Sequence, residues 1–161
     1  MRYFIELRYD GTAYCGWQRQ KSAPSVQQCI EQGLSTLLRC PTEIVGAGRT
    51  DTGVHASYYV AHFDAALPIA DTASFAYHLN AILPRDIAVM SISQVNDEAH
   101  ARFDAVRREY RYRIEPKKNP FTRAHAWQYY VTLDVEAMNE AAARLLDFED
   151  FTSFAKLNSN N

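Results

Sequence analysis

The 161-residue sequence has few cysteines and no long apolar run. Its three cysteines, Cys15, Cys29 and Cys40, are odd in number and have no C-x-x-C spacing, which indicates neither a disulfide framework nor a zinc site. No hydrophobic run approaches the roughly 18 residues of a membrane span, and charges interrupt the first residues too often for a secretory signal. We therefore expect a cytoplasmic protein with no membrane segment.

Two further kinds of site are missing from the sequence. The five histidines form no H-E-x-x-H or comparable cluster, so no metal is expected. The phosphate-binding motifs G-x-x-x-x-G-K-[ST] and G-x-G-x-x-G both fail, because Val54 follows Gly53 in place of lysine and Asp51 stands where a third glycine belongs. Among the histidines, His55 remains a candidate functional residue because it lies close to Asp51 in the sequence.

The net charge of −2 conceals a strong segregation along the chain. Residues 51–101 hold six acids and one base, a net of −5, whereas residues 102–123 hold eight bases and three acids, a net of +5. The basic stretch is where a polyanion would bind.

The first part of the chain shows the periodicities of a small α+β domain. Alternation predicts strands over 2–9, 42–48, 56–63 and 87–95, and helical spacing predicts helices over 25–39, with Ser25 as N-cap, and 72–83. The order β-α-β-β-α-β is typical of a ferredoxin-like unit, with two helices on one face of an antiparallel sheet. We assign residues 1–98 to this unit.

Residues 99–161 read as the beginning of a second, similar α+β domain. Clean alternation predicts a strand over 107–114, with Arg107, Arg111 and Arg113 on one face, and a further strand is expected within 126–131. A helix follows Asp134, and residues 148–155 have the aromatic character of core material. Because this sheet has no further strands to complete it, we expect the chain to be part of a longer protein.

The loop after the first strand carries Trp17 among amides and bases, including Arg19. Such a loop can stack on and hydrogen-bond to nucleic acid, or Trp17 can pin it to the core. The sequence leaves both interpretations open.

The segment 46–56, GAGRTDTGVHA, concentrates glycines around an acid and a base. Asp51-Thr52-Gly53 resembles the tripeptide of aspartic proteases, but that chemistry needs two carboxylates sharing a proton, and the chain has no second copy of the tripeptide. A second interpretation is a surface ion pair between Arg49 and Asp51. A third is a lone, ionised nucleophile or base presented on a glycine-lined turn, which together with the basic stretch favours a nucleic-acid-modifying enzyme.

Six motifs in the same order resemble the tRNA pseudouridine synthase A family. They are YDGT at 9–12 with GWQRQ at 16–20, GRTDTGVHA at 48–56, NAILPRDI at 80–87, HARF at 100–103, REYRY at 108–112 and DFTSF at 150–154. Thr52 replaces the usual alanine, and Glu109 stands where a base is common. The family's proteins are also longer, so the resemblance implies further residues that complete the second domain.

The resemblance implies conversion of uridine to pseudouridine in the anticodon stem-loop of tRNA, at positions 38–40, without cofactor or metal, by a homodimer. Asp51 matches the essential aspartate, Arg49 its ion-pairing arginine, and Tyr110 the tyrosine that stacks on the target uracil. The residues expected to hold the RNA are Arg19, Arg107, Arg108 and Arg111. The alternative is a catalytically incomplete fragment that binds RNA.

Overall fold

Strands and helices in the first 95 residues follow the order predicted from the sequence. We describe residues 1–154 in a computed structural model, in which the chain divides into two units, Met1–Tyr110 and Arg111–Asn161. The elements of the first unit are β1 (Arg2–Tyr9), α1 (Val26–Leu38), β2 (Ile44–Gly46), β3 (Ala56–Asp64), α2 (Thr72–Ile82) and β4 (Ile87–Val95), with a 3₁₀ turn at Gly11–Ala13.

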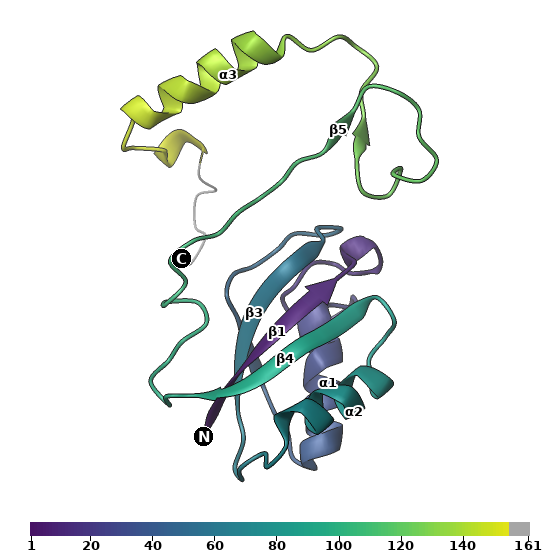
Figure 1. The fold of residues 1–161 in the computed structure, drawn as a ribbon, viewed down its shortest axis with the longest axis vertical. Helices are drawn as coiled ribbons and strands as arrows, with labels where there is room; N and C mark the ends of the chain where they lie inside the picture. Colours follow the sequence, from purple (N-terminus) through teal and green to yellow (C-terminus); the bar gives the residue numbers. More distant parts are fainter. Residues whose placement is uncertain (155–161) are drawn as a thin grey trace. The chain divides into compact units, whose positions relative to one another are not determined.

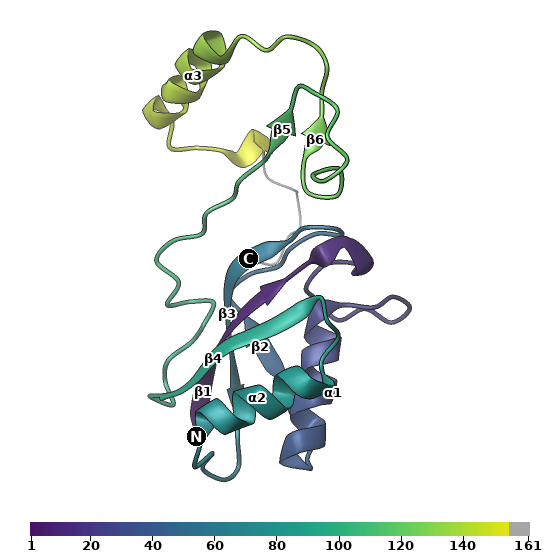
Figure 2. The same cartoon turned by 45° about the vertical axis from the view of Figure 1, so that its right-hand side comes forward.

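The four strands form one antiparallel sheet in the order β2-β3-β1-β4. Both helices lie on the same face of this sheet, as Figure 1 and the turned view in Figure 2 show. The α+β, ferredoxin-like class predicted from the sequence is therefore confirmed. β2 is shorter than the predicted strand over 42–48, because its pairing with β3 covers only Ile44–Gly46.

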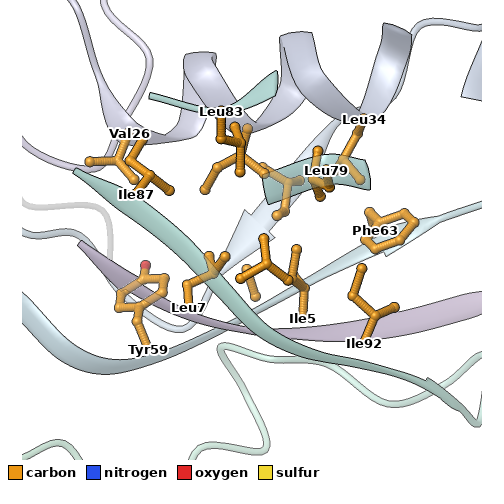
Figure 3. Packing of buried hydrophobic residues seen from close by; sticks show 14 of the residues in the cluster. Ile5, Leu7, Val26, Leu34, Tyr59, Phe63, Leu79, Leu83, Ile87 and Ile92 are labelled. Atoms are coloured by element: carbon orange, nitrogen blue, oxygen red, sulfur yellow. The ribbon is translucent and has the colours of Figure 1, made fainter. Parts of the chain in front are cut away.

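The core lies between the sheet and the two helices (Figure 3). Alternate residues of β1 point into it, including Ile5 and Leu7, and they meet the apolar stripe of α1, to which Leu34 belongs. Burying a side chain of this size contributes about 1.5–3 kcal/mol. This burial determines which face of each strand points inward. It thereby also positions the loops at the strand ends.

Side-chain caps set the starts of the helices where the sequence predicts them. Ser25 accepts a hydrogen bond from the Gln28 backbone N–H at 3.3 Å, and Asp71 accepts one from Ser74 at 2.9 Å. α1 ends when Arg39 adopts the left-handed conformation, with φ 56°, ahead of Pro41.

The predicted strand over 107–114 is wrong. Only Ile114–Glu115 forms a strand, β5, which pairs in parallel with β6 (Trp127–Gln128), itself shorter than the 126–131 segment in which a strand was expected. Alternation describes the side chains but supplies no hydrogen-bonding neighbour. Residues 105–113 are not part of a strand, and the backbone pairing with β6 begins only where the Arg113 carbonyl accepts from the Trp127 N–H at 2.9 Å.

The second unit also contains α3 (Val135–Ala143) and 3₁₀ turns at Arg144–Asp147 and Thr152–Phe154. Asp134 caps α3 as expected, accepting from the Ala137 backbone N–H at 2.9 Å. Between residues 111 and 154 no side chain is buried, so the aromatic segment expected as core is exposed up to Phe154, and Ala155 lies outside the described residues. Across residues 1–154, no helix combines the length and the apolar character that crossing a membrane requires.

Candidate active site

Asp51 occupies the first position of a tight turn between β2 and β3. The Val54 backbone N–H donates to the Asp51 carbonyl at 3.2 Å, and Gly53, the third residue of the turn, has φ +78°. A positive φ at this position is characteristic of a type II turn and favours glycine. The sequence therefore has a glycine here for reasons of backbone geometry, and the turn leaves the side chain of Asp51 exposed.

The loop after β1 holds this turn from the side. The backbone N–H of Trp17 donates to the Thr50 carbonyl at 3.1 Å, and that of Gly53 donates to the Tyr14 carbonyl at 3.3 Å. Gly16 has φ +83°, and a side chain there would collide with the Thr50 carbonyl. The residue before the turn and the third residue of the turn are thus held in place, while Asp51 itself stays accessible.

Three aromatic side chains form the floor beneath the segment 46–50. Trp17 is only 3% exposed and packs against Tyr59 with ring centroids 4.3 Å apart and the ring planes tilted by 33°. The Tyr59 hydroxyl donates to the carbonyl of Gly48 and accepts from its N–H at 3.3 Å, and the Tyr9 hydroxyl lies 3.0 Å from Thr50 Oγ1. Trp17 therefore packs in the core, which decides between the two roles that its sequence allowed.

Burial raises the pKa of the Tyr59 hydroxyl well above its ordinary range, and burial also raises the pKa of Tyr9. Both phenols therefore keep their protons at neutral pH and remain hydrogen-bond donors. In this geometry Tyr59 holds the backbone of Gly48, and Tyr9 contacts the side chain of Thr50.

Asp51 and Arg49 are both exposed, and the expected ion pair between them is not formed. Among residues 1–154 the Asp51 carboxylate has neither an ion-pair nor a hydrogen-bond partner. Water competes effectively with a pair between two exposed charges, whose attraction is typically worth less than about 1 kcal/mol. The carboxylate is consequently open to an external molecule.

Tyr110 is 70% exposed and ends the first unit. Its phenol lies close enough to Tyr9 and Tyr59 to raise their pKa values further, after the effect of burial. The structure thus brings the phenol of Tyr110, which is distant in sequence, within electrostatic range of the two tyrosines that support the Asp51 turn.

The arginines expected to hold RNA have different surroundings. Arg19 Nη2 lies 2.5 Å from the buried carboxylate of Glu31, and Arg107 Nη2 bonds Glu109 Oε2 at 2.9 Å on an exposed surface. Arg108 donates to two backbone carbonyls within the first unit. Arg111 is exposed and belongs to the second unit.

His55 follows the turn and contacts the loop after β1, not Asp51. Its Nδ1 lies 3.1 Å from the Gly11 backbone nitrogen and 3.0 Å from Asp10 Oδ1. Nδ1 accepts from Gly11 when it carries no proton and donates to Asp10 when it does, so the two contacts belong to different states of the ring. In either state His55 joins the two loops.

The supporting roles of Tyr9, Tyr59 and Arg108 were not anticipated from the sequence. One signal was available for Tyr59, because it falls on the buried face of β3, and a buried tyrosine hydroxyl usually finds a hydrogen-bond partner. For Arg108 there was none, since its acceptor at Ala47 lies 61 residues away along the chain.

Comparison with known proteins places this arrangement in a family. Residues 7–104 match the family model described as tRNA pseudouridine synthase. The chain is 52% identical over 159 residues to tRNA pseudouridine synthase A of Bacteroides thetaiotaomicron, covering 99% of this chain and 59% of that protein. It is 50% identical over 159 residues to the Bacteroides fragilis protein of the same name, covering 99% and 63%, and 44% identical over 158 residues to that of Maricaulis maris, covering 95% and 62%.

The chain therefore spans about three fifths of the length of the curated relatives that it matches. The family match runs from the end of β1 through β4 and includes the Asp51 turn, the loop that holds it and the floor of aromatic side chains. On this evidence the chain belongs to the tRNA pseudouridine synthase family.

Proposed function

We propose that this chain carries the catalytic aspartate of a tRNA pseudouridine synthase, and that Asp51 isomerises uridine to pseudouridine in the anticodon stem-loop, at positions 38–40. The observation that carries the proposal is the geometry of Asp51: an exposed carboxylate without a partner among residues 1–154, on a turn whose neighbours are fixed from two sides. A fixed backbone beneath an accessible reactive group is what positioned catalysis requires.

The proposed reaction is an isomerisation within one nucleotide. The N1–C1′ bond of uridine breaks, the uracil rotates, a C5–C1′ bond forms, C5 loses its proton and N1 gains one. Substrate and product have the same composition, so the proposed reaction consumes neither cofactor nor co-substrate. The Asp51 carboxylate can serve by attacking the sugar or the base, or by taking a sugar proton.

The target base must leave the helical stack before Asp51 can reach its glycosidic bond. The exposed ring of Tyr110 can stack on the extruded uracil, a contact typically worth about 1–3 kcal/mol. Arg49, exposed and next but one to Asp51, can bind the phosphate or sugar of the same nucleotide. Arg19, Arg107 and Arg111 are proposed to contact phosphates of the stem.

Release of tritium from tRNA labelled at uridine C5 tests this proposal, because isomerisation expels the C5 hydrogen. We expect release by the chain, loss of release in Asp51→Asn, and unchanged tRNA affinity in that variant. The full-length Bacteroides thetaiotaomicron relative serves as the positive control. Undiminished release by Asp51→Asn would remove Asp51 from the catalytic role.

The second candidate is an RNA-binding fragment without catalytic activity, and it is favoured by one observation: between residues 111 and 154 no side chain is buried. If the chain binds tRNA but releases no tritium while the relative does, this candidate replaces the first. The resemblance also supports a cytoplasmic homodimer for the full-length protein, which light scattering of that protein would test.

A further inference from the structure

The side chain of Arg108 joins two segments that are far apart in the sequence. Its Nε and Nη2 donate to the Ala47 carbonyl at 3.1 and 2.8 Å, and Nη2 also donates to the Arg102 carbonyl at 2.7 Å. We propose that Arg108 is a positioning residue that clamps the segment carrying Tyr110 to the loop carrying Asp51. This inference rests on the proposed function.

The acceptor at Ala47 is itself held in place. Ala47 follows β2 directly, and its backbone N–H donates to the Val60 carbonyl of β3 at 2.9 Å. The next residue, Gly48, is bonded at both its N–H and its carbonyl by Tyr59, and Arg108 Nε lies 3.4 Å from where a side chain of Gly48 would begin. The guanidinium therefore binds a backbone that the sheet already fixes, four residues before Asp51.

The segment that Arg108 holds is also attached to the sheet through residues 99 and 101. The Ala101 backbone N–H donates to Nδ1 of the buried His62 at 3.1 Å, and Arg2 Nη1 donates to the Ala99 carbonyl at 3.0 Å. Residues 105–113 form no strand, so backbone pairing does not orient Tyr110. Arg108, two residues before Tyr110, supplies that orientation through its side chain.

The number and direction of its bonds distinguish Arg108 from a phosphate-binding arginine. Charge-assisted bonds from a planar guanidinium fork to two carbonyls depend on the shape of the group as well as on its charge. Arg107, by contrast, has a side chain that is 79% exposed and bonds an exposed glutamate. A lysine at 108 would keep the charge but could not reproduce the Nε and Nη2 pair on Ala47.

The test compares Arg108→Lys with Arg107→Ala and with Arg85→Lys, an exposed arginine of the same unit outside the proposed site. We expect Arg108→Lys to lower the first-order rate of tritium release from bound tRNA at least tenfold, with tRNA affinity within twofold of the unsubstituted chain. Arg107→Ala should instead weaken binding and make its dependence on salt shallower. Arg85→Lys should change neither quantity.

Nuclear magnetic resonance of the unsubstituted chain supplies a readout that is independent of activity. The Arg108 Nε–H should exchange with solvent at least tenfold more slowly than that of Arg85, and Arg108→Lys should accelerate exchange of the Ala47 and Gly48 amides. Free exchange of the Arg108 Nε–H, or a loss of tRNA affinity in Arg108→Lys with an unchanged release rate, would overturn the clamp. If the unsubstituted chain releases no tritium, the proposed function fails for this chain and the exchange measurements alone decide whether the clamp exists.

Discussion

The hydroxyl of Tyr9 lies 3.0 Å from Oγ1 of Thr50, so the last residue of β1 is tied to the residue directly before Asp51. β1 is one of the two central strands of the antiparallel sheet, paired with both β3 and β4. The most buried strand of the unit is thereby connected to its proposed reactive residue through one side chain.

Tyr9→Phe should weaken this connection without altering the packing of the ring. Loss of one part-buried hydrogen bond should lower the free energy of unfolding by about 1 kcal/mol. Tritium release should fall several-fold, because Thr50 then fixes Asp51 less well. Urea denaturation and the release assay measure the two effects, and Tyr77→Phe, at a position 73% exposed, is the matched control. Equal effects of the two substitutions would show that the Tyr9 hydroxyl has no special role.

Two glycines beside Asp51 should respond differently to alanine. No atom lies within 4 Å of a side chain built on Gly53, so Gly53→Ala should cost only the left-handed conformation, about 1–2 kcal/mol. Gly16→Ala adds a collision with the Thr50 carbonyl and should be clearly more destabilising. Gly53→Asn should recover part of the loss, because asparagine tolerates positive φ. The free energy of unfolding, measured by urea denaturation, should be lowest for Gly16→Ala, higher for Gly53→Ala and highest for Gly53→Asn. The reverse order would contradict this prediction.

Acid should destabilise the first unit through His62. Burial is the main cause that lowers the pKa of His62 from 6.5 to about 4, and Nδ1 accepts the Ala101 N–H only without a proton. The charged and titratable groups that also act on it are Arg2, His100, Asp64 and Asp104. Between pH 6.5 and 4 the unfolded chain binds a proton that the folded chain does not, so stability falls as the pH falls through this window.

The expected loss from His62 is about 2–3 kcal/mol between pH 7 and pH 4, measured by urea denaturation at several pH values. His62→Asn keeps an acceptor in a similar position but cannot be protonated in this range, so its stability should change less across the same window. Identical pH profiles for the two proteins would place the acid sensitivity elsewhere.

The sequence predicted an element correctly where packing against the core requires apolar residues at regular intervals. β1, β3, β4, α1 and α2 were predicted to within a few residues because one face of each packs in the core shown in Figure 3. Residues 107–114 alternate just as clearly, but a strand also needs a neighbour, and alternation carries no information about one.

The candidate site was predictable to a similar extent. The glycines around Asp51 indicated an exposed turn, since φ at Gly53 is a local property. The contacts of Arg108 with Ala47 and of Tyr9 with Thr50 join residues 61 and 41 positions apart, and no local sequence pattern predicts them. The ion pair between the exposed Arg49 and Asp51 was expected from their spacing and from the family resemblance, neither of which accounts for competition by water.

Arg19 offers a test that separates support of the fold from binding of RNA. Glu31 is 4% exposed; its Oε1 accepts from Gln27 Nε2 at 3.0 Å and from the Ile44 backbone N–H at 3.2 Å, while its Oε2 lies 2.5 Å from Arg19 Nη2. Arg19→Ala leaves a buried carboxylate oxygen without its cation, which should lower the free energy of unfolding by about 1–3 kcal/mol, toward the lower end because Arg19 is 55% exposed.

The double variant Arg19→Ala/Glu31→Gln should recover part of this stability, because a neutral amide is less costly to bury than an unpaired carboxylate. Lys21→Ala, at a neighbouring exposed base, should leave unfolding unchanged. If Arg19→Ala weakens tRNA binding and the double variant restores stability but not affinity, Arg19 has both roles, held by Glu31 and facing the RNA. If stability is unaffected by Arg19→Ala, the ion pair with Glu31 does not support the fold, since removing the cation from a buried carboxylate must otherwise cost free energy.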